Sequence, residues 1–168
     1  SWLPCTSLVC NTQSVYLPAA TIALTHSSLC DPLMTFVWGT NGLASGLSRD
    51  DAILSGLYEY IERDSIVSWN NLISAGSLKE ALVDTTTVPF DSTQKLVQLI
   101  RAQGFNLYIF DRTSDLGIPV YRAIIHSPYD ATVSFAEGYG CHHLDEIAVN
   151  RAITEAAQSR TVIIAGAL

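Results

Sequence analysis

Three strand-like segments follow one another in the second half of the chain, and they constrain the fold more than any other feature. Residues 106–110, 119–126 and 132–138 are rich in β-branched and aromatic side chains. The connection between the first two, DRTSDLGI, carries the residues typical of turns. These strands outnumber what a simple parallel βαβ array needs. We therefore expect an α+β fold, with a mixed sheet and helices packed on it.

A long helix is predicted from Ser48 to about Trp69. Ser48 and Asp51, three residues later, resemble a capping box in which aspartate replaces the usual glutamate. Apolar side chains then recur at helical spacing. They are Ile53, Leu57, Tyr60, Ile61 and Val67. Just before this helix, the segment GTNGLASG has the glycines of a tight loop whose backbone amides could approach a ligand.

The remaining elements are read from capping and breaking residues. Two further helices are expected, one from Asp91 or Ser92 to Gly104 and one from about Asp145 through at least Arg160. Additional expectations are a strand or two short strands over 14–24, a strand over 34–38 and a short helix over 77–82.

Composition excludes several classes of protein. The chain has 168 residues, of which 48% are hydrophobic and 15% charged, as expected for one globular domain with a real core. A net charge of −7 argues against a basic face for nucleic acid. No apolar run is long enough to cross a membrane, and no secretion signal opens the chain. We expect a cytoplasmic location.

The cysteines form no recognisable metal or redox motif. Cys5, Cys10, Cys30 and Cys141 include no CxxC pair, so free buried thiols are the first interpretation. A disulfide or a zinc site stays open as the alternative.

The first cluster with chemical potential lies in SGLYEYIERD. Ser55, Glu59 and Glu62 follow i, i+4, i+7 spacing and share one face of the predicted helix. Two glutamates one turn apart repel each other, and a divalent cation such as Mg²⁺ converts that cost into a gain. Arg63 follows directly and could reach a phosphate. The alternative is a solvated polar stripe in which Arg63 pairs with a neighbouring acid.

The second cluster lies in TEAAQSR. Glu155 and Gln158 are one turn apart, Arg151 lies a turn earlier, and Arg160 follows closely. The opposite face of this helix is apolar. An ordinary amphipathic surface helix is the alternative interpretation.

The third cluster is EGYGCHHLDE. Gly138 and Gly140 precede the expected start of the last helix, so their amides could face an anion. A zinc site is one interpretation of the adjacent Cys141, His142 and His143, but no second Cys/His cluster with matching spacing supports it. A capping or packing histidine is the simpler interpretation.

Brought together, the first two clusters would form a carboxylate-rich pocket edged by Arg63 and Arg160. Such a pocket is suited to a magnesium–nucleotide complex, because metal and guanidinium groups neutralise phosphates. The chain carries no Walker-type GxxxxGK[ST] sequence, no kinase signature set and no GxSxG elbow.

Read together, these segments resemble the YcaO-domain family. Residues 41–69 look like its first signature, a glycine-rich loop followed by a helix with Ser-x3-Glu-x2-Glu-Arg. Residues 115–160 look like its second, in which a GIPV strand leads to Gly-x-Gly-x-His and then Glu-x2-Gln-x-Arg. The two signatures occur in the family's order and spacing, over most of the chain from residue 36 on.

The resemblance implies an ATP-binding fold without a P-loop. Family members use ATP and Mg²⁺ to activate a peptide backbone amide, commonly described as phosphorylation of the amide oxygen. A nucleophile then attacks the amide carbon and gives azoline heterocycles (precursors of thiazoles and oxazoles), thioamides or amidines. If the ligand positions of the family motifs are matched to this chain, magnesium would be held by Glu59, Glu62 and Glu155. The nucleotide or its metal would be lined by Ser55, Arg63, Gln158, Arg160, Asn41 and His142. No covalent nucleophile is expected.

Family domains are longer than this chain, so residues 1–168 are expected to form a single partial YcaO-like domain that is inactive alone. The expected partners are a peptide or protein substrate, a leader-binding protein and a second copy in a homodimer. One alternative is a non-catalytic folded fragment that self-associates and binds nucleotide weakly or not at all. Another is an unrelated α+β interaction domain, in which Glu59, Glu62 and Glu155 would lie far apart.

Overall fold

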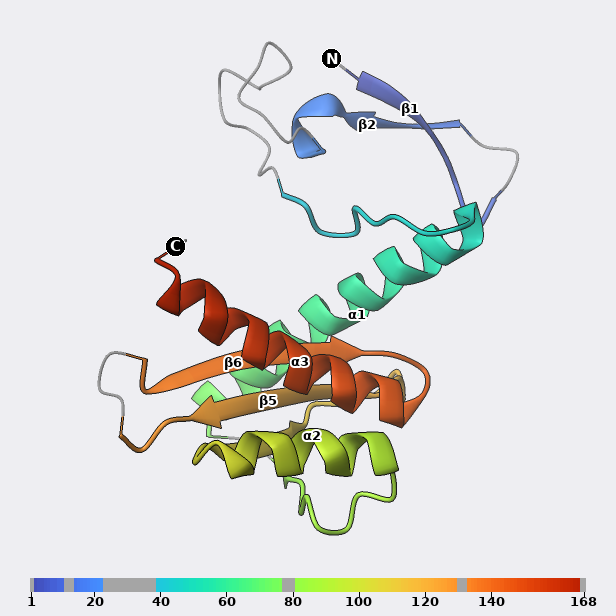
Figure 1. The fold of residues 1–168 in the computed structure, drawn as a ribbon. Coiled ribbons are helices and arrows are strands. Elements are labelled where there is room, and N and C mark those ends of the chain that lie inside the picture. Colours follow the sequence, from blue (N-terminus) through green and yellow to red (C-terminus); the bar gives the residue numbers. More distant parts are fainter. Residues whose placement is uncertain (1, 11–13, 23–38, 77–80, 130–132, 167–168) are drawn as a thin grey trace. The chain divides into compact units, whose positions relative to one another are not determined.

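The computed structural model describes residues 2–10, 14–22, 39–76, 81–129 and 133–166. The chain divides into two compact units, Ser1–Gly56 and Leu57–Leu168, which can be followed by colour in Figure 1. The strand expected over 34–38 and Cys30 lie outside the described residues.

The first unit opens with a β-hairpin. Strands β1 (Trp2–Thr6) and β2 (Ser14–Pro18) pair antiparallel, with Trp2 opposite Pro18. A 3₁₀ turn, Ala19–Thr21, follows. Of the strand or two short strands predicted over 14–24, the structure has β2, which ends at Pro18 because proline has no N–H to continue a ladder. Residues 23 and 24 lie outside the described residues.

The glycine-rich loop of this unit makes a tight turn against the start of helix α1 (Arg49–Ser74). The Leu43 N–H donates to the Thr40 carbonyl at 2.9 Å, and Gly42 has a φ of 77°, a conformation that favours glycine. A Cβ on Gly56 would lie 2.7 Å from the Gly42 carbonyl oxygen. Glycine at both positions thus allows loop and helix to touch.

The capping box that opens α1 is confirmed. The Asp51 N–H donates to Ser48 Oγ at 3.1 Å, and the Ser48 N–H donates to Asp51 Oδ2 at 3.1 Å. The helix continues to Ser74, a little beyond the predicted end at Trp69.

The second unit is built on a four-stranded sheet in the order β3-β4-β5-β6. Its strands are β3 (Ala81–Leu82), β4 (Asn106–Asp111), β5 (Val120–His126) and β6 (Phe135–Cys141). The α+β class is confirmed. All pairings among the described strands are antiparallel, in contrast to the mixed sheet expected. The connection between β4 and β5 is too short for the crossover that a parallel pair needs.

Residues 81–82 belong to strand β3, which corrects the short helix predicted over 77–82. The Val83 N–H donates to the Ile109 carbonyl at 2.8 Å and so extends this pairing with β4 by one bond. Residues 77–80 lie outside the described residues. Backbone pairing with a neighbouring strand outweighs the helical propensity of so short a segment.

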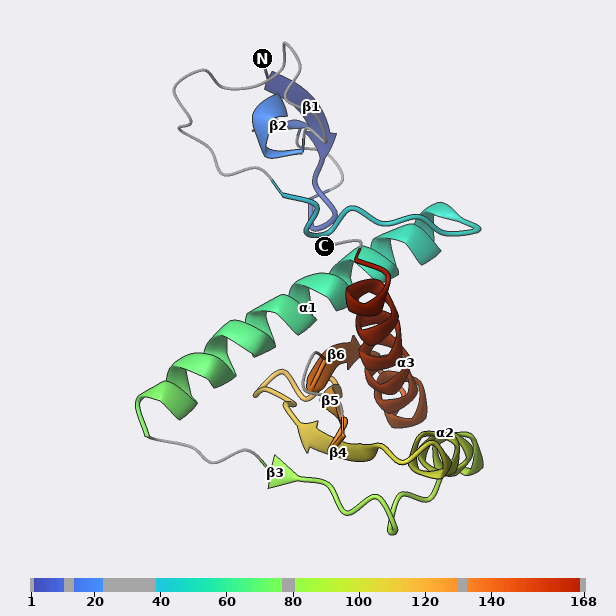
Figure 2. The ribbon, with the colours of Figure 1, turned by 60° about the vertical axis from the view of Figure 1, so that its left-hand side comes forward.

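Helices α2 (Asp91–Ala102) and α3 (Asp145–Ile164) cover one face of the sheet, as Figure 2 shows with the sheet turned nearly on edge. They bury an apolar core of small and branched side chains. Its members are Val97, Leu107, Ile109, Ala123, Ile125, Val149, Ala152, Ile153 and Ala156. Gly104, with a φ of 80°, follows the end of α2, as predicted.

The part of α1 from Leu57 onward packs on the opposite face of the sheet. Tyr58 is buried there against Val120 and Cys141. Further along the helix, Ser65 Oγ donates to the Arg112 carbonyl, and Arg112 Nη1 donates to Asn70 Oδ1 at 3.0 Å. This face therefore contains polar and ionisable groups where the other is apolar.

Two smaller expectations can be compared with the structure. Cys141 is a buried free thiol, as expected, whereas Cys5 is half-buried and Cys10 exposed, and both are also free. Among the residues described, no helix combines the length and the apolar character needed to cross a membrane.

Candidate functional site

Glu62 from α1 and Glu155 from α3 interact electrostatically. Burial, and after it the negative charge of Glu155, are the main causes that raise the pKa of Glu62 from 4.5 to about 7. Arg63 and Arg151 lower the pKa, and Glu59 has a smaller raising effect. The structure thus places acids from both predicted clusters in one electrostatic environment.

The other carboxylates differ from Glu62 in their surroundings. Glu155 is exposed, and its Oε2 accepts the backbone N–H of Tyr139 at 3.2 Å. Glu59 Oε1 lies 3.9 Å from Arg63 Nη2, one turn along the same helix. This ion pair is the alternative contact considered for Arg63 in the sequence, a pairing with a neighbouring acidic residue. The Arg63 side chain remains half exposed.

Two arginines of α3, Arg151 and Arg160, have different surroundings. Arg160 Nη1 donates to the Val133 carbonyl at 2.6 Å, and its guanidinium lies 4.7 Å from the centroid of the Phe105 ring. It is Arg151 that lies within the field of Glu62, while its Nη1 donates to the Cys141 carbonyl at 3.2 Å. The signal for Arg151 is its position one helical turn before Glu155.

The remaining expected ligand residues are placed as follows. Gln158 is exposed on α3, one turn beyond Glu155. Ser55 lies on the part of α1 that belongs to the first unit. Asn41 is exposed in the Thr40–Leu43 turn of that unit.

His142 serves the turn between β6 and α3. Its N–H donates to the Pro119 carbonyl at 3.2 Å, and its Nδ1 accepts the Leu144 N–H at 3.1 Å. The ring lies 4.9 Å from Tyr58 and 4.3 Å from His143, centroid to centroid. Burial lowers the pKa of His142, as do the charges of His143 and Arg151. These are the capping and packing contacts of the simpler interpretation.

Sequence reasoning missed Tyr58, and it considered His143 only as a possible zinc, capping or packing residue. The Tyr58 hydroxyl and His143 Nδ1 form a hydrogen bond that joins α1 to the β6–α3 turn. Burial is the main cause that raises the pKa of the neighbouring Cys141 thiol to about 11, followed by Glu62. A lone tyrosine beside ExxE gives no sequence signal for such a partner.

Gly138 and Gly140 have a packing role that the sequence did not indicate. They lie inside β6 rather than before a helix, and a Cβ on either would lie 2.2 Å from the α3 backbone, at Ala156 N or Ala148 O respectively. Their absent side chains let α3 rest directly on the strand. That their amides face an anion stays a prediction.

The donor set can be compared with what magnesium requires. No three His, Cys, Asp or Glu side chains converge as a metal-binding group in the part of the chain that the structure describes. Magnesium usually takes only one or two protein carboxylates, together with waters and substrate phosphates. The Glu62–Glu155 pair, with its unfavourable charge, fits that requirement.

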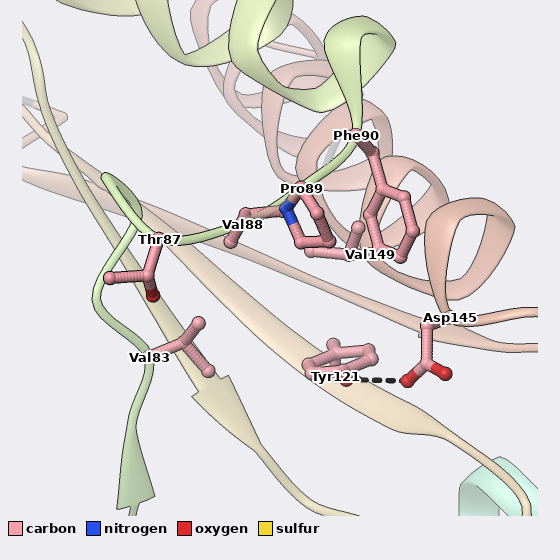
Figure 3. Close-up of a pocket in the computed structure, with 8 residues that line it drawn as sticks. All are labelled: Val83, Thr87, Val88, Pro89, Phe90, Tyr121, Asp145 and Val149. Carbon is pink, nitrogen blue, oxygen red and sulfur yellow. Dashed lines mark hydrogen bonds between the residues drawn. The ribbon is translucent and has the colours of Figure 1, made fainter.

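A separate pocket of about 260 Å³ lies on the other face of the sheet. Figure 3 shows its apolar walls and, at one side, the Tyr121 hydroxyl donating to Asp145 Oδ1 at 2.7 Å. Burial and Asp145 raise the pKa of Tyr121. Asp145 precedes Glu155 by roughly 15 Å of helix, so this pocket is distinct from the acid pair.

Comparison with known proteins assigns the family. A sequence model of the family described as YcaO cyclodehydratase, ATP- and Mg²⁺-binding, matches residues 1–168. The chain therefore belongs to the YcaO family.

Individual relatives agree in sequence and in fold. An uncharacterized protein in the tfuA 3′ region of Rhizobium leguminosarum bv. trifolii is 36% identical over 162 residues, which are 92% of this chain and 37% of that protein. A heterocyclase solved with substrate and cofactor has a TM-score of 0.77 and 30% identity, over 94% of this chain and 20% of that one. YcaO from Methanopyrus kandleri, bound with AMPPCP and Mg²⁺, has a TM-score of 0.73 and 25% identity, over 98% and 41%. The chain thus spans less than half the length of these relatives.

Proposed function

We propose that this chain supplies the magnesium–nucleotide-binding part of an enzyme that uses ATP to activate a peptide backbone amide. The observation that carries the proposal is the half-buried Glu62, whose charge is disfavoured by burial and by Glu155. A cation bound between the two helices would relieve both costs. The family's description as ATP- and Mg²⁺-binding supports the same conclusion.

Each side chain has a role in this proposal. Glu62 and Glu155 would hold the metal, with Glu59 as the third carboxylate, and bound Mg²⁺ supplies charge neutralisation at the phosphates. Arg63, half exposed beside Glu59, would bind a phosphate group of the nucleotide. The positive charge of Arg151 would offset part of the negative charge around Glu62. The remaining proposed nucleotide contacts are Ser55, Gln158, Arg160, Asn41 and His142.

The chemistry proposed needs no covalent nucleophile from this chain. The amide oxygen attacks the terminal phosphoryl group of ATP and releases ADP. A thiol, hydroxyl, sulfide or amine then attacks the amide carbon, and the phosphorylated oxygen leaves as inorganic phosphate. The products are azolines, thioamides or amidines. The protein's own contribution is positioning and electrostatic stabilisation, which dominate phosphoryl transfer.

The substrate and partners follow from the same proposal. The related heterocyclase was solved with its substrate, and a peptide or protein substrate is proposed for this chain as well. A leader-binding partner, a homodimer and a cytoplasmic location belong to the proposal. Because the chain spans less than half of its relatives, we propose that it is one part of the family's full domain.

Calorimetry of a non-hydrolysable ATP analogue, with and without Mg²⁺, tests the proposal. Glu62→Gln and Glu155→Gln should each weaken Mg²⁺-dependent binding at least roughly tenfold, since each removes a charged ligand. The matched control is Glu146→Gln. Glu146 lies on α3 but accepts a hydrogen bond from Ser92 Oγ of α2 at 2.6 Å. Its substitution should leave nucleotide binding unchanged.

A second candidate function is a folded fragment that self-associates and binds nucleotide weakly or not at all. Well-folded protein without Mg²⁺-dependent binding in the same titration would support this candidate and contradict the first.

A further inference from the structure

Tyr58 links the helix that carries Glu59 and Glu62 to the turn that leads into the helix of Glu155. It precedes Glu59 and lies one turn before Glu62 on α1. Its side chain is 7% exposed, and its ring packs against Val120 and Cys141. Its hydroxyl forms a hydrogen bond with His143 Nδ1. A buried tyrosine is thus joined at its polar end to another element.

The turn that receives Tyr58 is itself firmly held. The backbone N–H of His142 donates to the Pro119 carbonyl at 3.2 Å, and the backbone N–H of Leu144 donates to His142 Nδ1 at 3.1 Å. Arg151 of α3 donates to the Cys141 carbonyl at 3.2 Å. Because Arg151 also lies in the field of Glu62, the turn and the acid pair share one electrostatic neighbour.

We propose that Tyr58 and His143 are positioning residues for the acid pair, and this inference rests on the proposed function. Residues one turn apart on a helix lie on nearly the same face. A hydrogen bond that fixes Tyr58 therefore also fixes the rotation of α1 that presents Glu62 to Glu155. Neither residue touches the nucleotide in this proposal, and both act through Glu62.

The chain offers a closely matched pair of tyrosines for the test. Tyr58→Phe removes the hydroxyl bonded to His143 and keeps the ring. Tyr121→Phe removes a hydroxyl bonded to Asp145 on the opposite face of the sheet, in the pocket of Figure 3. Both substitutions delete one phenol hydrogen bond, so general losses of stability should be similar.

The measurement is a Mg²⁺ titration at saturating non-hydrolysable ATP analogue, by calorimetry. Tyr58→Phe and His143→Ala should each weaken the apparent Mg²⁺ affinity roughly fivefold, the effect of one hydrogen bond. Because both remove the same bond, the double variant should be no weaker than His143→Ala. Tyr121→Phe should keep the wild-type affinity. Unchanged affinity in Tyr58→Phe, equal loss in Tyr121→Phe, or additive losses would overturn the inference.

A ligand-free measurement separates this inference from the proposed function. Ile61 packs against the cluster of Tyr58, Val120 and Cys141. NOEs from the Ile61 methyl groups to that cluster should weaken in Tyr58→Phe and stay unchanged in Tyr121→Phe. Wild-type protein that binds no Mg²⁺–nucleotide would contradict the proposed function. Intact Ile61 NOEs in Tyr58→Phe would contradict the positioning role, whatever the nucleotide result.

Discussion

The two faces of the four-stranded sheet have been built for different tasks. The face under α2 and α3 is apolar and closely fitted, with backbone touching backbone at Gly138 and Gly140. The face under α1 carries Tyr58, Glu62 and the buried Arg112. Apolar packing supplies most of the stability of a domain, whereas burial of ionisable groups opposes it. The first face therefore stabilises the fold, whereas the ionisable groups on the second face lower its stability.

Residues on the second face illustrate the cost. Arg112 is 1% exposed, and Asn70 and the Trp69 ring are among its partners. A buried guanidinium requires such partners because desolvation of an isolated charge costs several kcal/mol. Substitutions on the two faces should accordingly change the free energy of unfolding by different amounts and even in opposite directions.

The largest effect is expected at the closely fitted face. A valine at Gly138 would place its Cβ 2.2 Å from the Ala156 nitrogen, and α3 would have to move. Gly138→Val should lower the free energy of unfolding by about 3 kcal/mol or more, measured by urea denaturation. Tyr139→Val, next in the strand and on the other face, is the control and should cost clearly less. Equal losses would remove the contrast between the faces.

An intermediate effect, of opposite sign, is expected at Glu62. Its pKa in the folded chain is about 7, above the ordinary value of 4.5. The folded state thus binds this proton more tightly, and the free energy of unfolding falls as pH rises from 4.5 to about 7. Without Mg²⁺ at pH 8, Glu62→Gln should be more stable than wild type by on the order of 1–3 kcal/mol.

Thermal denaturation across pH measures this effect. The stabilisation by Glu62→Gln should vanish near pH 4, where the wild-type carboxyl is protonated. Glu146→Gln should give no comparable gain at pH 8. A destabilised Glu62→Gln at pH 8 would mean that the carboxylate is favoured in the folded state.

The smallest effect is expected for the ion pair between Arg122 and Glu137 on neighbouring strands. Arg122 Nη2 lies 2.7 Å from Glu137 Oε2, and the Glu137 side chain is 42% exposed. Since solvent screens such a pair, Glu137→Gln should cost about 0.2–1 kcal/mol, and less at 1 M salt. A loss of unfolding free energy above this range that does not depend on salt would contradict the expectation that solvent screens the pair.

The sequence predicted those elements whose signals are local. The Ser48–Asp51 cap, the three main helices and the consecutive strands from 106 all follow from short-range patterns of turns, caps and periodicity. The order of the two signatures also identified the family. By contrast, 81–82 became a strand through pairing with β4, a long-range contact that no local propensity records.

For the candidate site, the sequence indicates only which side chains share a face of one helix, and the ligand set stays a prediction. Helical spacing placed Glu59 with Glu62 and Glu155 with Gln158, each on one helix, but spacing cannot tell which arginine faces which acid. The Arg160 guanidinium packs on the Phe105 ring, and the charge of Arg151 acts on Glu62. The Tyr58–His143 bond joins residues 85 positions apart, beyond any local pattern.

The carboxylate of Glu155 has a further consequence, because it also caps an amide of an edge strand. Strand β6 ends the described sheet, and Glu155 Oε2 accepts the Tyr139 N–H. An uncapped edge amide invites a strand of another molecule to pair with it, which is a route to aggregation. Truncating Glu155 would open that route, and insolubility could then be mistaken for loss of a metal ligand. Glutamine, whose amide oxygen can still accept the bond, keeps the edge closed.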